Sequence, residues 1–248
     1  MRYTRLKSSI RVVSTALLIA AVSGCSHGDA ETTVSNPYAR NMSFAVAPVL
    51  NFSGEPSFDP IKAADLLASE LTYVEGVTVL PVSRVVALLA SQGRTQIESP
   101  AHAIAVADAV GADAIIVAGI SEYDAYTPVV GLVIQVYAVP RTAPVAVDPV
   151  HAERMAQPIT LRSMADATLP RDQIQMVYNG THSNVTDSVK KYAAPRSEQD
   201  SPLGWREYVK VQTLFLRFCW HDAIDRLMTN ERWRHAVVMP NNAMEYPL

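Results

Sequence analysis

The sequence predicts an α/β fold in which a mixed β-sheet packs with helices, with additional helices near the carboxyl terminus. Short apolar runs bounded by turn residues alternate with stretches whose apolar residues recur every three or four positions, the patterns of strands and amphipathic helices. One run, residues 114–120, contains no charged residue and suits a strand buried on both faces. The 248 residues are 49% hydrophobic and 18% charged, which supports a large core and excludes disorder throughout.

Residues 1–24 have the pattern of a secretory signal peptide. Four basic residues and no acidic residue precede a nearly unbroken apolar run at residues 12–22. That run has about half of the roughly 20 apolar residues needed to span a bilayer, which argues against a permanent transmembrane helix. Residues 22–25, Val-Ser-Gly-Cys, then resemble a bacterial lipobox, whose cysteine is diacylated before cleavage in front of it. We therefore expect Cys25 to carry the lipid anchor, with fatty-acyl groups such as palmitate.

The residues after the cleavage point indicate where the protein resides. Ser26 stands where lipoproteins of the inner membrane typically carry Asp, so the resemblance points to the outer membrane and the periplasm. Removing four basic residues leaves 17 basic against 24 acidic residues, a net charge of −7, which disfavours nucleic acid as a partner. Residues 25–41 are small and polar and suit a flexible tether. Cys219 lies between two aromatic residues, which favours a buried apolar side chain over a reactive thiol.

A single domain is expected over residues 42–230. Its first strand is the apolar run at residues 44–50, in which Pro48 indicates an edge position or a bulge. Asp59 and Pro60 then provide a helix cap and a first-turn proline.

The next elements continue the alternation. The pattern predicts a second strand at residues 77–80 and a helix at residues 83–92. A third helix is expected between its cap, Ser99, and Gly111. The strand at residues 114–120 is expected to be central in the sheet.

Residues 130–139 alternate as a strand with one wetter face. With this strand, the elements within residues 42–140 resemble the CsgG-like group. That group includes the curli secretion lipoprotein, LpoB and domains similar to the amino-terminal domain of TolB. The segments that carry the resemblance are residues 44–54, 63–71, 79–84 and 111–123. The resemblance implies non-enzymatic work in the periplasm at the outer membrane. The curli channel adds membrane hairpins whose strands need about 9 to 11 alternating residues. Only residues 130–139 approach that pattern, so we expect no pore.

The second half of the chain is expected to add one strand and several helices. Residues 141–172 lack a regular pattern, apart from a helical turn near residues 151–155. Within residues 173–230, the pattern predicts a strand, a helix and a longest helix, at residues 173–178, 184–193 and 205–228 respectively. The broad apolar stripe of the longest helix favours core packing over a partner-binding face. About 55 residues are too few for a separate core, so we expect this part to pack on the first half. Residues 231–248 are expected to be a flexible tail.

The sequence shows no catalytic signature. We find none of the motifs of zinc sites, serine hydrolases or nucleotide-binding loops, and we expect no cofactor and no metal. His182, Asp187 and Ser188 lie close in sequence, but proximity along one helix is not the geometry of a catalytic triad. His221 and Asp222 suit an exposed pair on a helix.

Two hypotheses for the function remain. The first is an outer-membrane-tethered periplasmic lipoprotein with a binding, assembly or regulatory role, an unknown envelope protein as partner, and a homo-oligomer left open. The second is an envelope enzyme with a site near the end of the strand at residues 114–120. Three acidic residues flank this strand, where α/β sheets often bind ligands: Asp113, Glu122 and Asp124. Turn formation and capping remain the favoured roles for them.

Overall fold

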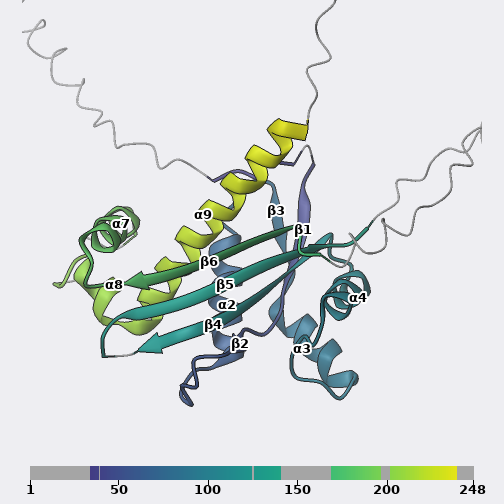
Figure 1. Ribbon diagram of the computed structural model, residues 1–248, viewed down its shortest axis with the longest axis horizontal. Helices are drawn as coiled ribbons and strands as arrows, with labels where there is room; N and C mark the ends of the chain where they lie inside the picture. Colours follow the sequence, from purple (N-terminus) through teal and green to yellow (C-terminus); the bar gives the residue numbers. More distant parts are fainter. Residues whose placement is uncertain (1–33, 39, 125, 141–168, 197–201, 239–248) are drawn as a thin grey trace, which may run out of the picture. The chain divides into compact units, whose positions relative to one another are not determined.

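The computed structural model describes residues 34–38, 40–124, 126–140, 169–196 and 202–238, which belong to one compact unit that starts at Thr33. Its six-stranded sheet has the order β3-β1-β4-β5-β6, and β2 also pairs with β4. Figure 1 shows this sheet with its helices. The strands are β1 (Met42–Val46), β2 (Leu50–Asn51), β3 (Val77–Val79), β4 (Ala114–Asp124), β5 (Val129–Ala138) and β6 (Asp172–Asn179). The first four run parallel, whereas β5 and β6 are antiparallel additions. The predicted mixed sheet and the central place of β4 are confirmed.

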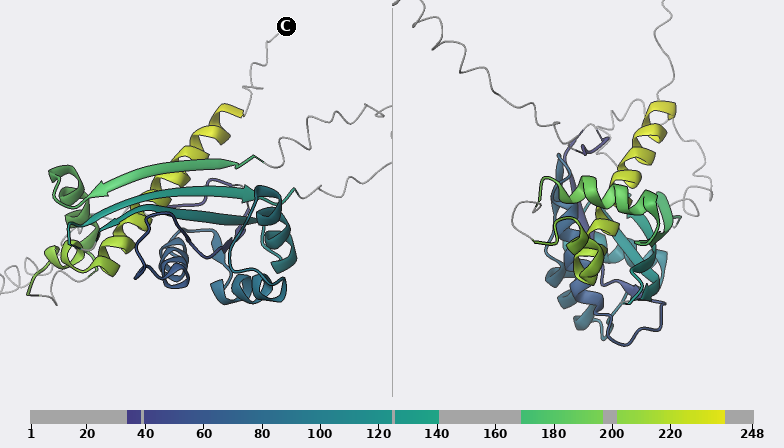
Figure 2. Two further views of the ribbon diagram at one scale, coloured as in Figure 1. Left: turned by 60° about the horizontal axis from the view of Figure 1, so that its bottom comes forward. Right: turned by 90° about the vertical axis from the view of Figure 1, so that its left-hand side faces the viewer.

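Helices lie on both faces of the sheet. The helices are α2 (Pro60–Leu71), α3 (Val82–Ser91), α4 (Pro100–Val110), α7 (Ser183–Ala193), α8 (Arg206–Lys210) and α9 (Gln212–Val238). Phe44 and Val46 of β1 belong to a core shared with α2, α7, α8 and α9. Ala45, between them, belongs to a second core with α3 and α4. Because alternate residues of a strand point to opposite faces, the two sets of helices cover opposite faces of the sheet (Figure 2).

The residues predicted to delimit helices do so. Asp59 caps α2, because its side chain accepts hydrogen bonds from the backbone N–H groups of Ile61 and Lys62. Ser99 caps α4 in the same way through the N–H of His102, and Gly111 ends α4 in the left-handed conformation, with a φ of 79°. These contacts satisfy backbone groups that a helix end leaves without partners.

Pro48 lies in an interruption of the sheet. Three residues separate Val46 from Leu50, but only two separate their partners on β4, Ile116 and Gly119. One extra residue against a continuous partner strand is a bulge. β1, before Pro48, is interior between β3 and β4, whereas β2, after it, pairs with β4 alone. Of the two expected features, the extra residue gives the bulge, and it lies where the chain passes from an interior strand to an edge strand.

The carboxyl-terminal helix differs from its prediction in two ways. At Val211 the backbone is extended, with a ψ of 109°, and this residue separates α8 from α9. In addition, α9 continues to Val238, beyond the expected start of a tail at residue 231, because the Glu231 side chain is buried and accepts hydrogen bonds from Tyr38 and Arg171. The predicted irregular segment and helical turn within residues 141–168, and residues 239–248, lie outside the described residues.

The expected packing of this helix on the first half is confirmed. Phe215, Phe218 and Trp220 are fully buried in the core that α9 shares with α2 and the sheet. Val211, an apolar residue within the helix predicted at residues 205–228, is instead 42% exposed. Within the described part of the chain, no helix has the length and hydrophobicity that a membrane crossing requires.

Candidate functional site

The acidic residues around β4 lie at its two ends and do not form one site. Asp113 precedes the first residue of β4, whereas Glu122 and Asp124 are among its last three residues. At about 3.3 Å per residue, roughly 30 Å separates the two ends. Asp124 accepts hydrogen bonds from the backbone N–H groups of Tyr126 (2.8 Å) and Thr127 (3.2 Å), and these bonds lower its pKa. The geometry gives Asp124 the turn-forming role.

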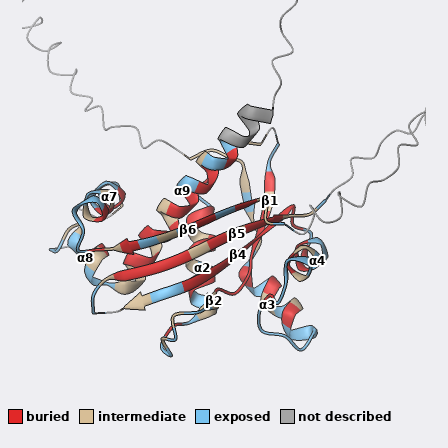
Figure 3. Ribbon diagram, viewed as in Figure 1, coloured by how far each residue is buried: buried red, intermediate tan, exposed pale blue. Residues whose placement is uncertain are grey.

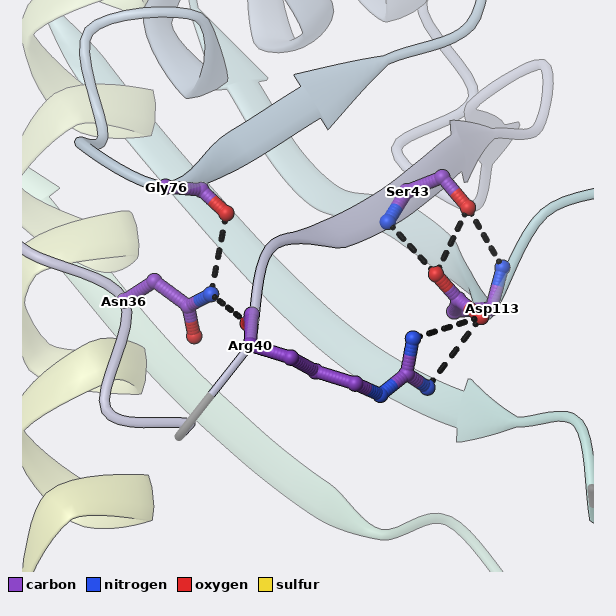
Figure 4. A network of polar contacts seen from close by, with 5 residues as sticks. All are labelled: Asn36, Arg40, Ser43, Gly76 and Asp113. Atoms are coloured by element: carbon purple, nitrogen blue, oxygen red, sulfur yellow. Dashed lines mark hydrogen bonds and ion pairs between the residues drawn. The ribbon is translucent and has the colours of Figure 1, made fainter. Parts of the chain in front are cut away.

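Asp113 belongs to a polar network that fastens the start of β4 to β1 (Figure 4). Its Oδ2 accepts hydrogen bonds from the backbone N–H and the hydroxyl of Ser43, both at 2.8 Å. Both terminal nitrogens of Arg40 lie 3.2 Å from Asp113 Oδ1. Burial opposes ionisation, but the hydrogen bonds from Ser43 and the Arg40 guanidinium outweigh it and lower the pKa of Asp113. Asp113 is therefore a structural carboxylate.

Residues 34–41, which the sequence assigned to the tether, are partly bound to the domain. The backbone N–H of Asn36 donates to the carbonyl of Glu75 (2.8 Å), and Ser35 forms a parallel β-bridge with Glu75. The Asn36 side-chain amide donates to the carbonyls of Arg40 and Gly76, each at 2.9 Å. We call this segment the amino-terminal clasp. Backbone pairing makes it part of the fold.

The clasp also contacts α9 and lines a pocket. The Tyr38 hydroxyl donates to Glu231, the Arg171 guanidinium lies 4.5 Å from the centre of the Tyr38 ring, and Arg232 donates to the Ser35 carbonyl. A pocket of about 540 Å³ lies beside these contacts, lined by residues of the clasp together with Glu75 and Gly76. Several of the lining polar groups are engaged in holding the clasp, which favours attachment over catalysis.

Glu70 forms a buried polar cluster that sequence reasoning missed. Its carboxylate is fully buried and accepts hydrogen bonds from Arg217 Nε (2.9 Å) and the Tyr192 hydroxyl (3.0 Å), with His221 Nδ1 at 3.6 Å. Burial would raise the pKa of Glu70, but the contacts with His221, Arg217 and Tyr192 outweigh it and lower that pKa. The signal was its place three residues after Leu67 on the apolar face of α2. The cluster joins α2, α7 and α9.

His221 and Asp222 are not the exposed pair that the sequence suggested. The His221 ring packs on Tyr192, with 4.8 Å between ring centres, next to Glu70. Asp222 accepts hydrogen bonds from the Tyr178 hydroxyl (2.8 Å) and from Arg226 (2.7 Å). Each residue therefore holds α9 to a different neighbour.

The other residues considered from the sequence have ordinary surroundings. His182 precedes the first residue of α7 and is exposed, and Asp187 pairs with Lys190 at 2.8 Å. Cys219 is fully buried, and burial raises the pKa of its thiol, as expected for an unreactive side chain. Cys25 lies outside the described residues.

One half of the sheet has a face that no described helix covers. The helices α3 and α4 pack on β1, β4 and the end of β5, whereas the residues of β6 on this face are exposed (Figure 3). We define this surface as the open face. It consists of Phe52, Gly119, Gly131, Val133, Gln135, Gln173, Gln175 and Val177. None of these residues is charged, but the exposed Glu122 pairs with Gly131 and lies at the end of the same face. Phe52 and Val177 are 64% and 60% exposed.

Two glycines keep the open face flat. A Cβ atom on Gly119 would lie 2.8 Å from the Phe52 ring. A Cβ atom on Gly131 would lie 2.6 Å from the Ser121 hydroxyl and 3.2 Å from the backbone nitrogen of Glu122. The sequence predicted a wetter face for β5, but not Phe52, which reaches the face from the turn after β2.

Comparisons with known proteins concern the fold. No protein-family model and no curated protein sequence matches the chain. Among solved structures, the carboxyl-terminal domain of LpoB from Salmonella enterica is 12% identical over 57% of this chain and 85% of its own, with a TM-score of 0.39. Lipoprotein GNA1162 from Neisseria meningitidis is 15% identical over 63% of this chain and 99% of its own, with a TM-score of 0.37. The PelC dodecamer from Paraburkholderia phytofirmans is 17% identical over 44% of this chain and 70% of its own, with a TM-score of 0.28. The chain is similar to LpoB-like lipoproteins in fold, and at these identities the likeness concerns the fold alone.

Proposed function

We propose that the protein is a lipoprotein, anchored through Cys25 in the outer membrane and facing the periplasm, with a non-enzymatic binding, assembly or regulatory role in the cell envelope. The observation that carries this proposal is the open face, a flat surface with an exposed aromatic residue and a single charged residue, Glu122, at its end. The lipobox-like sequence supplies the anchor.

The composition of the open face suits contact with a macromolecule. The centres of protein interfaces are depleted of charged residues and enriched in aromatic ones. Here Phe52 and Val177 are exposed among uncharged amides and glycines, and Glu122 borders the face. Contiguous exposed apolar surface often marks an interaction site.

The clasp limits how far the domain lies from its anchor. Nine residues lead from Cys25 to Val34, the first described residue, and a chain extends at most about 3.5 Å per residue. Val34 therefore lies within roughly 30 Å of the lipidated cysteine. A bound clasp also defines the point of the domain from which the anchor leaves.

The anchor is tested with Cys25→Ser. Because acylation and cleavage both act at this thiol, we expect the variant to remain an unprocessed precursor without lipid. Mass spectrometry of protein purified from membranes checks this, with Cys219→Ser as the matched control that retains the lipid. An unmodified mature amino terminus at another position would contradict the anchor.

The binding role is tested with photo-crosslinking residues placed at Phe52 and Val177 in intact cells. We expect both positions to give crosslinks to the same envelope component, in a product whose mass differs from that of a dimer of this chain. Lys62, on the exposed side of α2, serves as the control position and should give none. The same products from all three positions would show random collision. The absence of any product from Phe52 and Val177 would contradict a binding role for the open face.

A further inference from the structure

The outer edge of β6 presents unpaired backbone groups among the described residues. β6 is the last strand of the sheet, and it pairs with β5 in one unbroken register over eight residues. The N–H of Gly180 donates to the carbonyl of Pro128 and continues that register. Hydrogen-bonded and non-hydrogen-bonded pairs alternate along an antiparallel ladder. Because Gly180 belongs to a hydrogen-bonded pair, the even-numbered residues of β6 bond to β5. The N–H and C=O groups of Gln173, Gln175 and Val177 therefore point away from the sheet.

Within the described residues, this edge lacks the devices that usually prevent strands from pairing with other chains. Such devices are short length, proline, lysine, a bulge or a cover. β6 contains no proline and no basic residue, and its ladder shows no register shift. Only the N–H of Gln173 has a local partner, the Asp172 carboxylate at 2.8 Å. At the opposite edge, β3 has only three residues, and Pro81 follows it closely.

We propose that β6 pairs with β6 of a second copy of this chain, antiparallel and about a two-fold axis at Gln175. In this register, Gln175 lies opposite Gln175 of the second copy, and Gln173 lies opposite Val177. The outward N–H and C=O groups of these residues then acquire backbone partners. The exception is the N–H of Gln173, which already donates to the Asp172 carboxylate. The two sheets join into one, and their open faces become continuous.

A second copy suits the edge because the pairing is self-complementary in charge. A two-fold contact uses the same patch twice, so a charged residue near the axis would lie opposite the same residue of the second copy and repel it. The residues that meet here are uncharged on the open face, and Ile174 meets Met176 on the other face. Asp172, the only charged residue of β6, lies opposite Tyr178 and not opposite itself. The pairing uses only described residues and does not depend on the lipid anchor.

Single cysteines test the register directly. Hydrogen-bonded antiparallel partners have Cα atoms about 5.5 Å apart, within the range of about 4.4 to 6.8 Å that a disulfide needs. In the full chain, Gln175→Cys should form a disulfide-linked dimer under mild oxidation. Val177→Cys, also exposed but offset from the axis, is the matched control. The double variant Gln173→Cys, Val177→Cys should regain the dimer, which confirms the pairing of these two positions. Cys219 is buried, so it does not compete, and the parent chain, which retains Cys25, measures any dimer formed through that thiol.

The measurement is the dimer fraction on non-reducing gels, from intact cells and from the purified full chain. We expect Gln175→Cys to give at least about tenfold more dimer than Val177→Cys. Equal dimer from both single variants would indicate collision and would overturn the proposal. No dimer from Gln175→Cys, or a disulfide to another protein there, would overturn it as well.

Disruption of the pairing provides a second measurement. Gln175→Lys places two positive charges opposite each other on an exposed position, and native mass spectrometry should show that the dimer is lost. The thermal unfolding of the monomer should change little, because this side chain makes no core contact. A dimer that persists in the Gln175→Lys variant would contradict a two-fold axis at this residue.

Discussion

The two halves of the sheet differ in how they are covered. In the parallel half, β1 and the first part of β4 lie between helices on both faces, whereas β6 and much of β5 have helices on one face and the open face on the other. Parallel neighbours need a crossover connection, usually a helix, and that helix covers the sheet. Antiparallel neighbours can be joined by a short turn and need no such helix. The connections thus determine which half of the sheet is available to a partner.

The largest expected effect contrasts the two faces of the antiparallel half. Phe218 is 2% exposed, and its ring packs edge-on against Tyr178 of β6, with 5.8 Å between ring centres. Phe218→Ala should lower the free energy of unfolding by about 3 to 5 kcal/mol, because it leaves a cavity. Val177→Ala, on the open face of the same strand, should change it by less than about 0.5 kcal/mol. Thermal unfolding of both variants checks this. A Phe218→Ala variant that melts normally but loses a partner would make this side of α9 an interface.

The second prediction concerns the polar cluster under the covered face. Arg217→Met leaves the buried Glu70 carboxylate without its main cation, and the loss of a partner from a buried pair is costly. Because Arg217 is 31% exposed, water screens part of the interaction, and we expect a loss of about 2 kcal/mol. Glu70→Gln with Arg217→Met should recover part of it. Chemical denaturation at pH 7 measures the three variants, and equal stability of all of them would contradict the cluster.

The same cluster predicts a dependence on pH. The folded protein lowers the pKa of Glu70, so ionised Glu70 stabilises the fold above the pKa of the unfolded chain. This contribution is lost as the pH falls through the lower pKa of the folded state. Compared with Glu70→Gln, the wild-type protein should therefore lose more stability on acidification from pH 7. If the wild-type protein and Glu70→Gln lose equal stability on acidification, ionised Glu70 does not stabilise the fold.

The smallest effect is expected on the open face. Gly119→Ala places a Cβ atom against the Phe52 ring, but this ring is exposed and can move aside, so we expect a loss below about 1 kcal/mol. Gly131→Ala should cost more, because its Cβ also meets the backbone of Glu122. The added variant Phe52→Ala should remove the cost of Gly119→Ala and leave that of Gly131→Ala unchanged. If Gly119→Ala still lowers the stability when Phe52→Ala is present, contact with the Phe52 ring is not the source of the strain.

Local signals in the sequence were sufficient for much of the fold. The caps Asp59 and Ser99, the terminating Gly111 and the uncharged run of β4 each act within a few residues, so their patterns identify the elements directly. The features that were missed depend on distant contacts. Glu231 extends α9 because Tyr38 and Arg171 reach it, and Glu70 is buried because α7 and α9 bring partners to it.

The candidate site was predictable only in part, for a similar reason. The alternation of β5 indicated one wetter face, and β6 was expected as a strand. Which face remains uncovered depends on where α3 and α4 pack, and no single segment encodes that. The extended backbone at Val211 was also missed, because the apolar pattern continues across it.

The clasp brings the two ends of the described domain together. Tyr38 and Ser35 contact Glu231 and Arg232, so the chain enters and leaves the fold within a few residues of the same place. With the proposed anchor at Cys25, the chain would leave α9 beside the segment that leads to the lipid. A force applied between the two termini would act first on the clasp and the last turns of α9, and the strands of the sheet would lie outside its path.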